Sequence, residues 1–267
     1  MTTIPFEQLN DAAQAVLSDT PAEEHDVLEI GEPPELVVDL PGGFYDPFTQ
    51  TVRVSAEVRE MTGEDEEALA RIDPVKNLSK FYDELLKRCL VSIDGEPVPV
   101  VSALLMGDRD FLLVAIRRVT YGDEMEFTML CPKCGENGPV TVHLSKDIPV
   151  VLDESPEKRT HSVTLRAGVA EVRFPTGEDQ SMVLAKSSAK TVPEMNTLLL
   201  SRVVETIDGN LVDAGKIRRL SSRDRKALMT FLSDKNPGLR VGAVKVPCSA
   251  CGFELPLSLD LADLLPV

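Results

Sequence analysis

The chain has 267 residues, of which 43% are hydrophobic and 27% are charged, and its formal net charge is −16. That length and apolar content suffice for one large domain or two ordinary domains with a packed core, which excludes wholesale disorder. The acidic excess argues against direct binding of nucleic acid or of an anionic membrane surface, because phosphate groups attract Lys and Arg.

No apolar run reaches the roughly 18–20 residues that a membrane span needs. The N-terminal stretch MTTIPFEQLNDAAQ lacks the basic and apolar regions of a signal peptide. We therefore expect a cytoplasmic protein. In that compartment paired cysteines are more often metal ligands than disulfides.

Residues 1–47 are predicted to form an acidic N-terminal arm. The first 50 residues contain eleven Asp or Glu side chains and no Lys or Arg. One short amphipathic helix is expected near the start, with an apolar face made of Phe6, Leu9, Ala13, Val16 and Leu17. Prolines among acids indicate extended chain after it. The run LPGGFYDP (40–47) is dense in turn residues and is expected to mark the entry to the first folded unit.

The first folded unit, residues 48–150, is predicted to combine strands and helices. Alternating apolar residues over 52–58 indicate a strand. Thr62 and Asp65 resemble a capping pair at the start of a helix, and Asp94-Gly95 indicates a turn. Two further helices are indicated by apolar faces made of Phe81, Leu85, Leu86, Cys89 and Leu90, and of Phe111, Leu112, Ala115, Ile116 and Val119.

A β-hairpin is expected to close this unit. The segment EMEFTML alternates between apolar and polar residues up to Cys131, and VTVHL alternates beyond the following CPKCG turn.

The same landmarks recur in the second part of the chain, which indicates an internal repeat. TGED at 62–65 returns at 176–179, and the IDG turn at 93–95 returns at 207–209, in both cases 114 positions later. A second CxxCG follows in the same relative place. We therefore predict an α+β fold made of two tandem copies of one unit, residues 48–150 and 162–267, each ending in a hairpin knuckle.

The two knuckles, CPKCG and CSACG, carry the strongest chemical signal in the chain. Each places two thiolates two residues apart and follows them with a glycine that can close the turn with a positive φ. Two such knuckles supply the S₄ set that suits zinc. We predict one structural zinc per chain in a Cys₄ ribbon, bound by Cys131, Cys134, Cys248 and Cys251.

Other interpretations of these cysteines stay open at this point. They can be free thiols or a disulfide, and the same four ligands can hold iron. A catalytic zinc is disfavoured because four protein ligands leave no open coordination position. Cys89 lies on a predicted apolar helix face and is expected in the core.

The remaining residues offer no catalytic constellation, so no enzymatic activity is expected. His143 alternates with apolar residues in a predicted strand, which favours a surface or hydrogen-bonded histidine over a fifth ligand. GNLVDAGKI (209–217) departs from a phosphate-binding loop in spacing and in its last residue. The charge clusters Asp108-Arg109-Asp110 and Arg223-Asp224-Arg225 begin predicted helices; solvated caps or intrachain ion pairs are expected there, with a partner contact as the alternative.

The first unit resembles the baseplate protein family of T-even-type contractile phages. The resemblance covers about residues 40–145 and is carried by LPGGFYDP, by AEVREMTGEDEEALA and above all by MGDRDFLLVAIRRVTYGDEMEFTMLCPKCG. The second unit departs more, since ALMTFLSD stands where FLLVAIRR would repeat. Family members are described as baseplate hub components or hub-assembly chaperones, and related proteins occur with phage-derived contractile injection systems.

The resemblance implies a non-enzymatic protein that builds or completes the baseplate hub of a phage tail. Its partners would be tail and baseplate hub proteins, and the acidic arm would contact a basic partner surface. It would act in the cytoplasm of the bacterial host during assembly and would then remain in the virion or leave. The rivals are a zinc-ribbon adaptor of transcription or nucleic-acid machinery, which the acidic charge disfavours, and an enzyme whose site the sequence does not reveal.

Overall fold

The computed structural model describes residues 31–97, 100–186, 191–257 and 259. The chain divides after Glu32 into a short N-terminal unit and a unit that spans Pro33–Val267. The predicted amphipathic helix near the N-terminus therefore lies outside the described residues. In the described part, no helix combines the length and apolar character that a membrane crossing requires.

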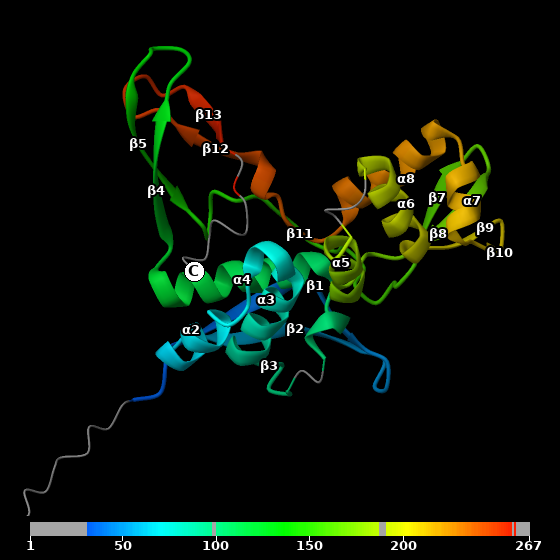
Figure 1. Cartoon of the computed structure of the whole chain (residues 1–267), viewed down its shortest axis with the longest axis horizontal. Helices are drawn as coiled ribbons and strands as arrows, with labels where there is room; N and C mark the ends of the chain where they lie inside the picture. Colours follow the sequence, from blue (N-terminus) through cyan, green and yellow to red (C-terminus); the bar gives the residue numbers. More distant parts are fainter. Residues whose placement is uncertain (1–30, 98–99, 187–190, 258, 260–267) are drawn as a thin grey trace, which may run out of the picture. The chain divides into compact units, whose positions relative to one another are not determined.

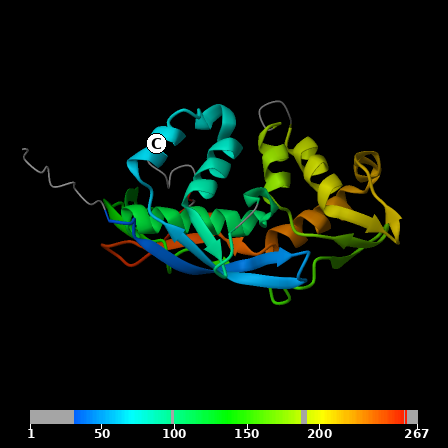
Figure 2. The same ribbon diagram turned by 90° about the horizontal axis from the view of Figure 1, so that it is seen from below.

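The first half of the larger unit, residues 35–121, is a three-stranded antiparallel sheet covered by helices. Its elements are β1 (Glu35–Asp46), β2 (Thr51–Arg59), α2 (Gly63–Leu69), α3 (Pro74–Cys89), β3 (Leu90–Ile93), η1 (Val101–Ala103) and α4 (Met106–Tyr121). The strand order is β1-β2-β3, and α4 lies across β1 and β2 (Figure 2). The predicted strand at 52–58 and the two predicted apolar helix faces are confirmed in β2, α3 and α4.

The expected turns at 40–47 are wrong. β1 continues to Asp46, and the irregularity is absorbed inside the strand as a register shift between Asp39 and Phe44. Gly43 makes this possible, because its φ is +72° and a Cβ there would meet the Val52 side chain at 2.6 Å. Residues 35–46 of the predicted acidic arm are consequently part of the sheet.

The second half, residues 161–235, has a similar order of elements, with a short extra strand and an α-helix where the first half has a 3₁₀ turn. They are β7 (His161–Leu165), β8 (Gly168–Val172), α5 (Gly177–Leu184), α6 (Val192–Val203), β9 (Val204–Ile207), β10 (Asn210–Leu211), α7 (Ala214–Arg219) and α8 (Ser222–Lys235). Their sheet has the order β10-β9-β8-β7. Each half has its own hydrophobic core, with Leu86 and Leu112 fully buried in the first and Leu200 and Leu228 fully buried in the second.

The two halves agree in strand register where their sheets correspond. Ala56 pairs with Ile93 in the first sheet, and Ala170 pairs with Ile207 in the second, 114 positions later. The register slips after Glu57 in one sheet and at the equivalent residue in the other. The predicted IDG turns are also alike, since Asp94 and Asp208 have φ values of 51° and 47°.

A third hydrophobic core lies between two hairpins, one following each half. The hairpins are β4 (Glu124–Leu130) with β5 (Asn137–His143), and β12 (Val244–Pro247) with β13 (Glu254–Leu257). Figure 1 shows them side by side, and Val142 from the first packs in one buried cluster with Val246 and Leu255 from the second. The fold is therefore mixed α/β with several small sheets, as predicted at that level.

The two halves differ in how the last helix leads into its hairpin. α4 ends at Tyr121, Gly122 caps it, and β4 begins at Glu124. α8 ends one residue before Asn236, and Pro237 then prevents the helix from continuing. The chain next forms β11 (Gly238–Leu239), which pairs with β6 (Val150–Val151), and the 3₁₀ turn η3 (Val241–Ala243) before β12. This crossover carries the second hairpin onto the first.

Candidate metal centre

Each knuckle is a tight turn between the strands of its hairpin. The Gly135 amide donates to the Cys131 carbonyl at 2.9 Å, and the Gly252 amide donates to the Cys248 carbonyl at 2.9 Å. Both glycines have a positive φ, 74° and 68°, which favours glycine at these positions. The sequence thus builds the same turn twice, with both thiols of a pair on one side of it.

The structure brings together all four cysteines that the sequence predicts as ligands. The Sγ atoms of Cys131 and Cys251 are 3.7 Å apart, those of Cys134 and Cys248 are 3.9 Å apart, and all four lie within 4.8 Å of one another. A tetrahedral ion with metal–sulfur bonds near 2.3 Å places its sulfur atoms about 3.8 Å apart. The cluster therefore has the dimensions of an S₄ metal site.

These distances also decide between some of the interpretations that the sequence left open. A disulfide requires sulfur atoms about 2 Å apart, and all four thiols are free in this arrangement. His143 is in β5, where its Nδ1 lies 3.5 Å from the Glu124 carboxylate, and it is not part of the cysteine cluster. Four thiolates can hold zinc or iron at the same distances, so the geometry leaves the identity of the ion open.

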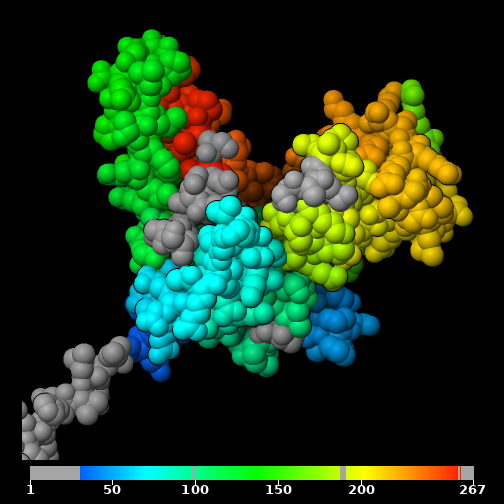
Figure 3. Space-filling view, in the orientation of Figure 1, coloured from blue at the N-terminus to red at the C-terminus, as the bar shows by residue number. Residues whose placement is uncertain are grey.

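One thiol of each pair faces the shared core and the other faces solvent. Cys131 is 1% exposed and Cys248 is 6% exposed, whereas Cys134 and Cys251 are exposed. Beside the cluster, the Lys133 ammonium lies 5.8 Å from the centre of the Phe253 ring, which joins the two knuckles by a cation–π contact. Figure 3 shows the second hairpin in red lying against the first in green.

The thiols differ in acidity because of their immediate neighbours. The Cys134 backbone amide lowers the pKa of the Cys131 thiol to about 7, against the opposing effect of burial. The Glu136 amide lowers the pKa of Cys134, but the neighbouring thiols, Cys251 first among them, raise it to about 12. One thiolate thus forms readily at neutral pH, and a bound cation would stabilise the others.

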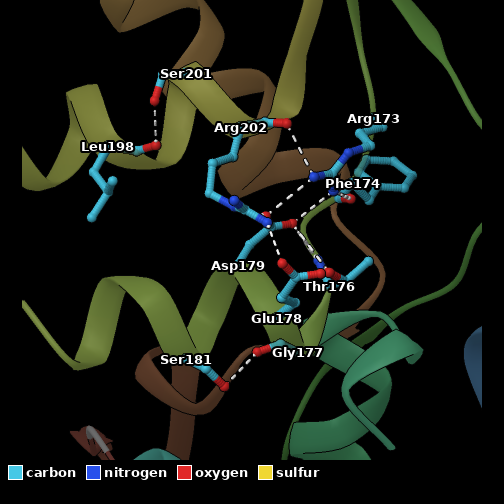
Figure 4. A network of polar contacts seen from close by, with 10 residues as sticks. All are labelled: Arg173, Phe174, Thr176, Gly177, Glu178, Asp179, Ser181, Leu198, Ser201 and Arg202. Carbon is cyan, nitrogen blue, oxygen red and sulfur yellow. Dashed lines mark hydrogen bonds and ion pairs between the residues drawn. The ribbon is translucent and has the colours of Figure 1, made fainter. Parts of the chain in front are cut away.

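Away from the cysteines, each half contains a carboxylate clamped by two arginines. Asp65 contacts Arg59 at 2.7 Å and Arg88 at 3.4 Å. Asp179 contacts Arg173 at 2.6 Å and also pairs with Arg202 (Figure 4). The Asp65 and Asp179 side chains are only 2% and 0% exposed.

Both clamps hold their carboxyl groups ionised. Burial tends to raise the pKa of Asp179, but hydrogen bonds from Arg173, Thr176 and Arg202 outweigh it and lower the pKa to about 2. The pKa of Asp65 is lowered by the equivalent bonds from Arg59 and Thr62, again against burial. Each carboxylate also accepts the backbone amide of its N-cap threonine, so the predicted capping pairs are confirmed. These clusters are structural ion pairs that anchor α2 and α5 to their sheets.

The Asp108-Arg109-Asp110 cluster is not a solvated cap. Asp108 and Arg109 are 0% and 1% exposed, because η1, β1 and α5 surround the start of α4. Arg109 forms an intrachain ion pair with Asp83 at 2.7 Å, and Asp108 accepts the Gly42 amide at 2.7 Å. Burial raises the pKa of Asp108 to about 7.

Sequence reasoning missed the glycines on which this junction depends. A Cβ on Gly107 would lie 1.7 Å from the Pro237 carbonyl oxygen, and one on Gly177 would lie 2.2 Å from Arg109 Nη1. Both glycines lie in the first turn of a helix, and nothing local in the sequence marks them as contact points.

Comparison with known proteins gives one match. Residues 47–210 match the family described as T4 bacteriophage base plate protein, a span that covers more than half of the chain and includes the first knuckle. No curated protein and no solved structure matches the chain.

Proposed function

The chain belongs to the T4 bacteriophage base plate protein family, and from that premise we propose that it is a non-enzymatic structural or assembly protein of a contractile tail baseplate hub. It would act either as a hub subunit or as a hub-assembly chaperone. In both roles it would act in the host cytoplasm during assembly, and as a hub subunit it would then remain in the virion. The family match carries this proposal, and the resemblance of the first half to hub proteins and hub chaperones narrows it to the hub.

A structural zinc held by Cys131, Cys134, Cys248 and Cys251 is part of the proposal. The sulfur spacing supports it, because it matches a closed tetrahedral site with no position left for substrate. Zinc is favoured over iron as the default ion of S₄ sites between two hairpins. The metal would clamp two hairpins whose parent halves have separate cores.

The two halves are proposed to be tandem copies of one α+β unit joined as a zinc ribbon. The support is the constant spacing of 114 positions that relates strand register, bulge and aspartate clamp in the first half to those in the second. Chance resemblance of two unrelated folds would not preserve one spacing across three kinds of interaction. The knuckles are 117 positions apart, which reflects small insertions after the IDG turns.

Partners would be tail and baseplate hub proteins. The acidic N-terminal residues supply a surface for a basic partner, and the net charge of −16 disfavours the rival role in nucleic-acid machinery.

The metal is tested by elemental analysis of the purified chain. One zinc per chain is expected, whereas no metal, two zincs per chain or iron would each contradict the shared zinc site. Retention of the chain on DNA at moderate salt would favour the rival role instead.

The hub role is tested by mass spectrometry of purified phage particles against the lysate. A hub subunit is present in particles in fixed proportion to other baseplate proteins, and a chaperone is present only in the lysate, bound to hub proteins. Absence of the chain from both particles and hub complexes would overturn the proposal.

A further inference from the structure

The two halves of the chain contact each other through surfaces that are not equivalent in the repeat. The first half contributes the start of α4, and the second half contributes the start of α5. The Met106 amide donates to the Pro175 carbonyl at 2.8 Å, and the Gly177 amide donates to the Leu104 carbonyl at 2.9 Å. The internal junction is therefore head-to-tail.

Side chains from α3 and α4 complete this junction. The Arg109 guanidinium packs against Gly177, where a Cβ would lie 2.2 Å from Nη1. Next to it, Gln180 donates to the Asp110 carboxylate at 3.1 Å. Ser79 of α3 donates to Ser181 of α5 at 2.5 Å.

A head-to-tail junction between two copies of one unit leaves an equivalent surface at each end of the pair. On the second half, Arg225 and Lys226 stand where Arg109 and Asp110 stand in the first, 116 positions earlier. Arg225 is held in the same way, since its Nη1 donates to the Ile217 carbonyl just as Arg109 Nη1 donates to the Val101 carbonyl. The arginine of the second half is thus placed as in the first.

On the first half, the matching surface is the start of α2. Gly63 and Glu66 stand where Gly177 and Gln180 stand in the second half, 114 positions later. A Cβ on Gly63 would meet nothing within 4 Å, whereas Gly177 lies against Arg109. The Gly63 surface is open where its counterpart is filled.

The two open surfaces carry opposite charge. α2 exposes Glu64, Glu66 and Glu67 and has no basic residue in its last turn. Around the start of α8, the exposed basic residues are Arg218, Arg219, Arg223 and Lys226. In the internal junction, the Asp110 carboxylate accepts a hydrogen bond from the Gln180 side-chain amide. The equivalent pair between two copies of the chain would be Lys226 with Glu66, which is an ion pair.

We propose that a second copy of this chain docks head-to-tail, with the start of α8 of one copy on α2 of the next. Arg225 of one copy would pack on Gly63 of the other, and Lys226 would pair with Glu66. Because the two surfaces differ, each copy can bind one neighbour at each end, so the assembly is a closed ring if the rotation between copies closes and an open chain if it does not. This inference rests on the repeat proposed above and does not depend on the bound metal.

The test is sedimentation velocity of the full zinc-loaded chain at about 0.05 M and about 0.5 M salt, because screening weakens contacts between exposed charges. Wild type should associate in a concentration-dependent way at low salt and dissociate at high salt. E66K and K226E should each weaken self-association about tenfold or more, because each places like charges together. E157K, which makes the same charge change as E66K at another exposed site, should associate like wild type.

Mixing the two reversed variants gives the decisive measurement. An equimolar mixture of E66K and K226E has one native and one swapped ion pair, so it should associate where each variant alone does not. The double variant E66K/K226E should also associate. Gly63→Leu should block association while leaving the fold intact, since the side chain enters open space within its own chain.

A monomeric wild type at low salt and high concentration would overturn the proposal, as would failure of the mixture to associate. Zinc content is measured on every variant. If all retain one zinc but none responds to the charge changes, the docking inference fails while the proposed metal site stands.

Discussion

The two halves of this chain have similar sheets and helices, but the chain takes a different path after the last helix of each half. α4 runs through Gly122 almost directly into β4, whereas α8 is stopped by Pro237 and followed by a crossover that pairs with β6. After α8, the β11–β6 pairing leads to the second hairpin, which shares a buried core with the first, and the four cysteines meet at the ends of these two hairpins.

The comparison teaches that equivalent residues can have unequal surroundings. The aspartate clamps and capping threonines lie inside a half, and their contacts are the same in both. Gly107 lies at the junction, and its counterpart Arg223 is exposed. Substitutions of equivalent residues that lie within each half should therefore change the stability of the protein equally. Substitutions of equivalent residues at the junction between the halves should change it unequally.

The largest effect is expected at the cysteines. Cys131→Ser and Cys248→Ser should each abolish tight zinc binding, which in small structural sites is worth roughly 10–16 kcal/mol. Because the proposed site takes two thiolates from each hairpin, either change should raise hydrogen exchange in both hairpins, around 124–143 and 244–257, and leave α3 protected. Ser249→Ala, in the same turn but not a ligand, should retain zinc.

A different outcome would show that the two hairpins do not share one metal ion. If Cys131→Ser loosened only the first hairpin while zinc remained bound, the shared clamp would be wrong. Removing the metal from wild type with a chelator should reproduce the effect of the variants, because Cys134 and Cys251 are exposed to solvent.

The aspartate clamps should show the next largest effect, equal in the two halves. Asp65→Asn and Asp179→Asn should each cost about 3 kcal/mol in free energy of unfolding, at the low end for a broken buried ion pair because the arginines are partly exposed. Chemical denaturation measures the change. Glu64→Gln and Glu178→Gln, which alter exposed neighbours, are the matched controls and should change stability little.

The clamps also predict the direction of the pH dependence. A carboxyl with a lowered folded pKa stabilises the fold above its unfolded pKa, about 3.9, and this stabilisation is lost as the pH falls through the folded value. For Asp179 that value is about 2, so wild-type stability should fall between about pH 4 and pH 2. Asp179→Asn should show a shallower fall over the same range; an unchanged slope would show that the clamp does not control acid stability.

Substitutions at the equivalent positions Gly107 and Arg223 are expected to have unequal effects on stability, because only Gly107 lies at the junction. Gly107→Ala should cost about 2 kcal/mol, because the added methyl group would lie 1.7 Å from the Pro237 carbonyl oxygen and the backbone must move. Arg223→Ala at the equivalent position, and Gly63→Ala in open space, should stay within about 0.5 kcal/mol of wild type. Equal costs at Gly107 and Arg223 would remove the asymmetry that the comparison describes.

The smallest effect is expected at the helix caps. Thr62→Ala and Thr176→Ala should each cost about 1 kcal/mol, since each removes a hydroxyl that donates to the clamped aspartate at 3.0 or 3.2 Å. Thermal unfolding of the two variants should give similar shifts. A loss confined to one half would mean that the two caps are not equivalent in energy.

Local patterns predicted much of this fold correctly. Apolar periodicity identified α3 and α4, and the TGED and IDG landmarks identified caps and turns that the structure repeats with the same geometry. These features depend on residues within a few positions of one another, so a single sequence contains the needed information. The strand β1 was missed because its one proline and two glycines are typical of turns, while its pairing with β2 tolerates an internal bulge.

By itself the sequence determined the residues that could bind a metal, the two knuckle turns and the family resemblance, because each is encoded in a short run of residue types. Only the tertiary structure decided that the four thiols meet, since that depends on the Pro237 crossover and on the core shared by the hairpins. It also decided that Asp108 and Arg109 are buried, which no local pattern distinguishes from a solvated helix start. Long-range packing sets burial and the meeting of distant segments, and the physical reason is that both arise from contacts between residues far apart in the chain.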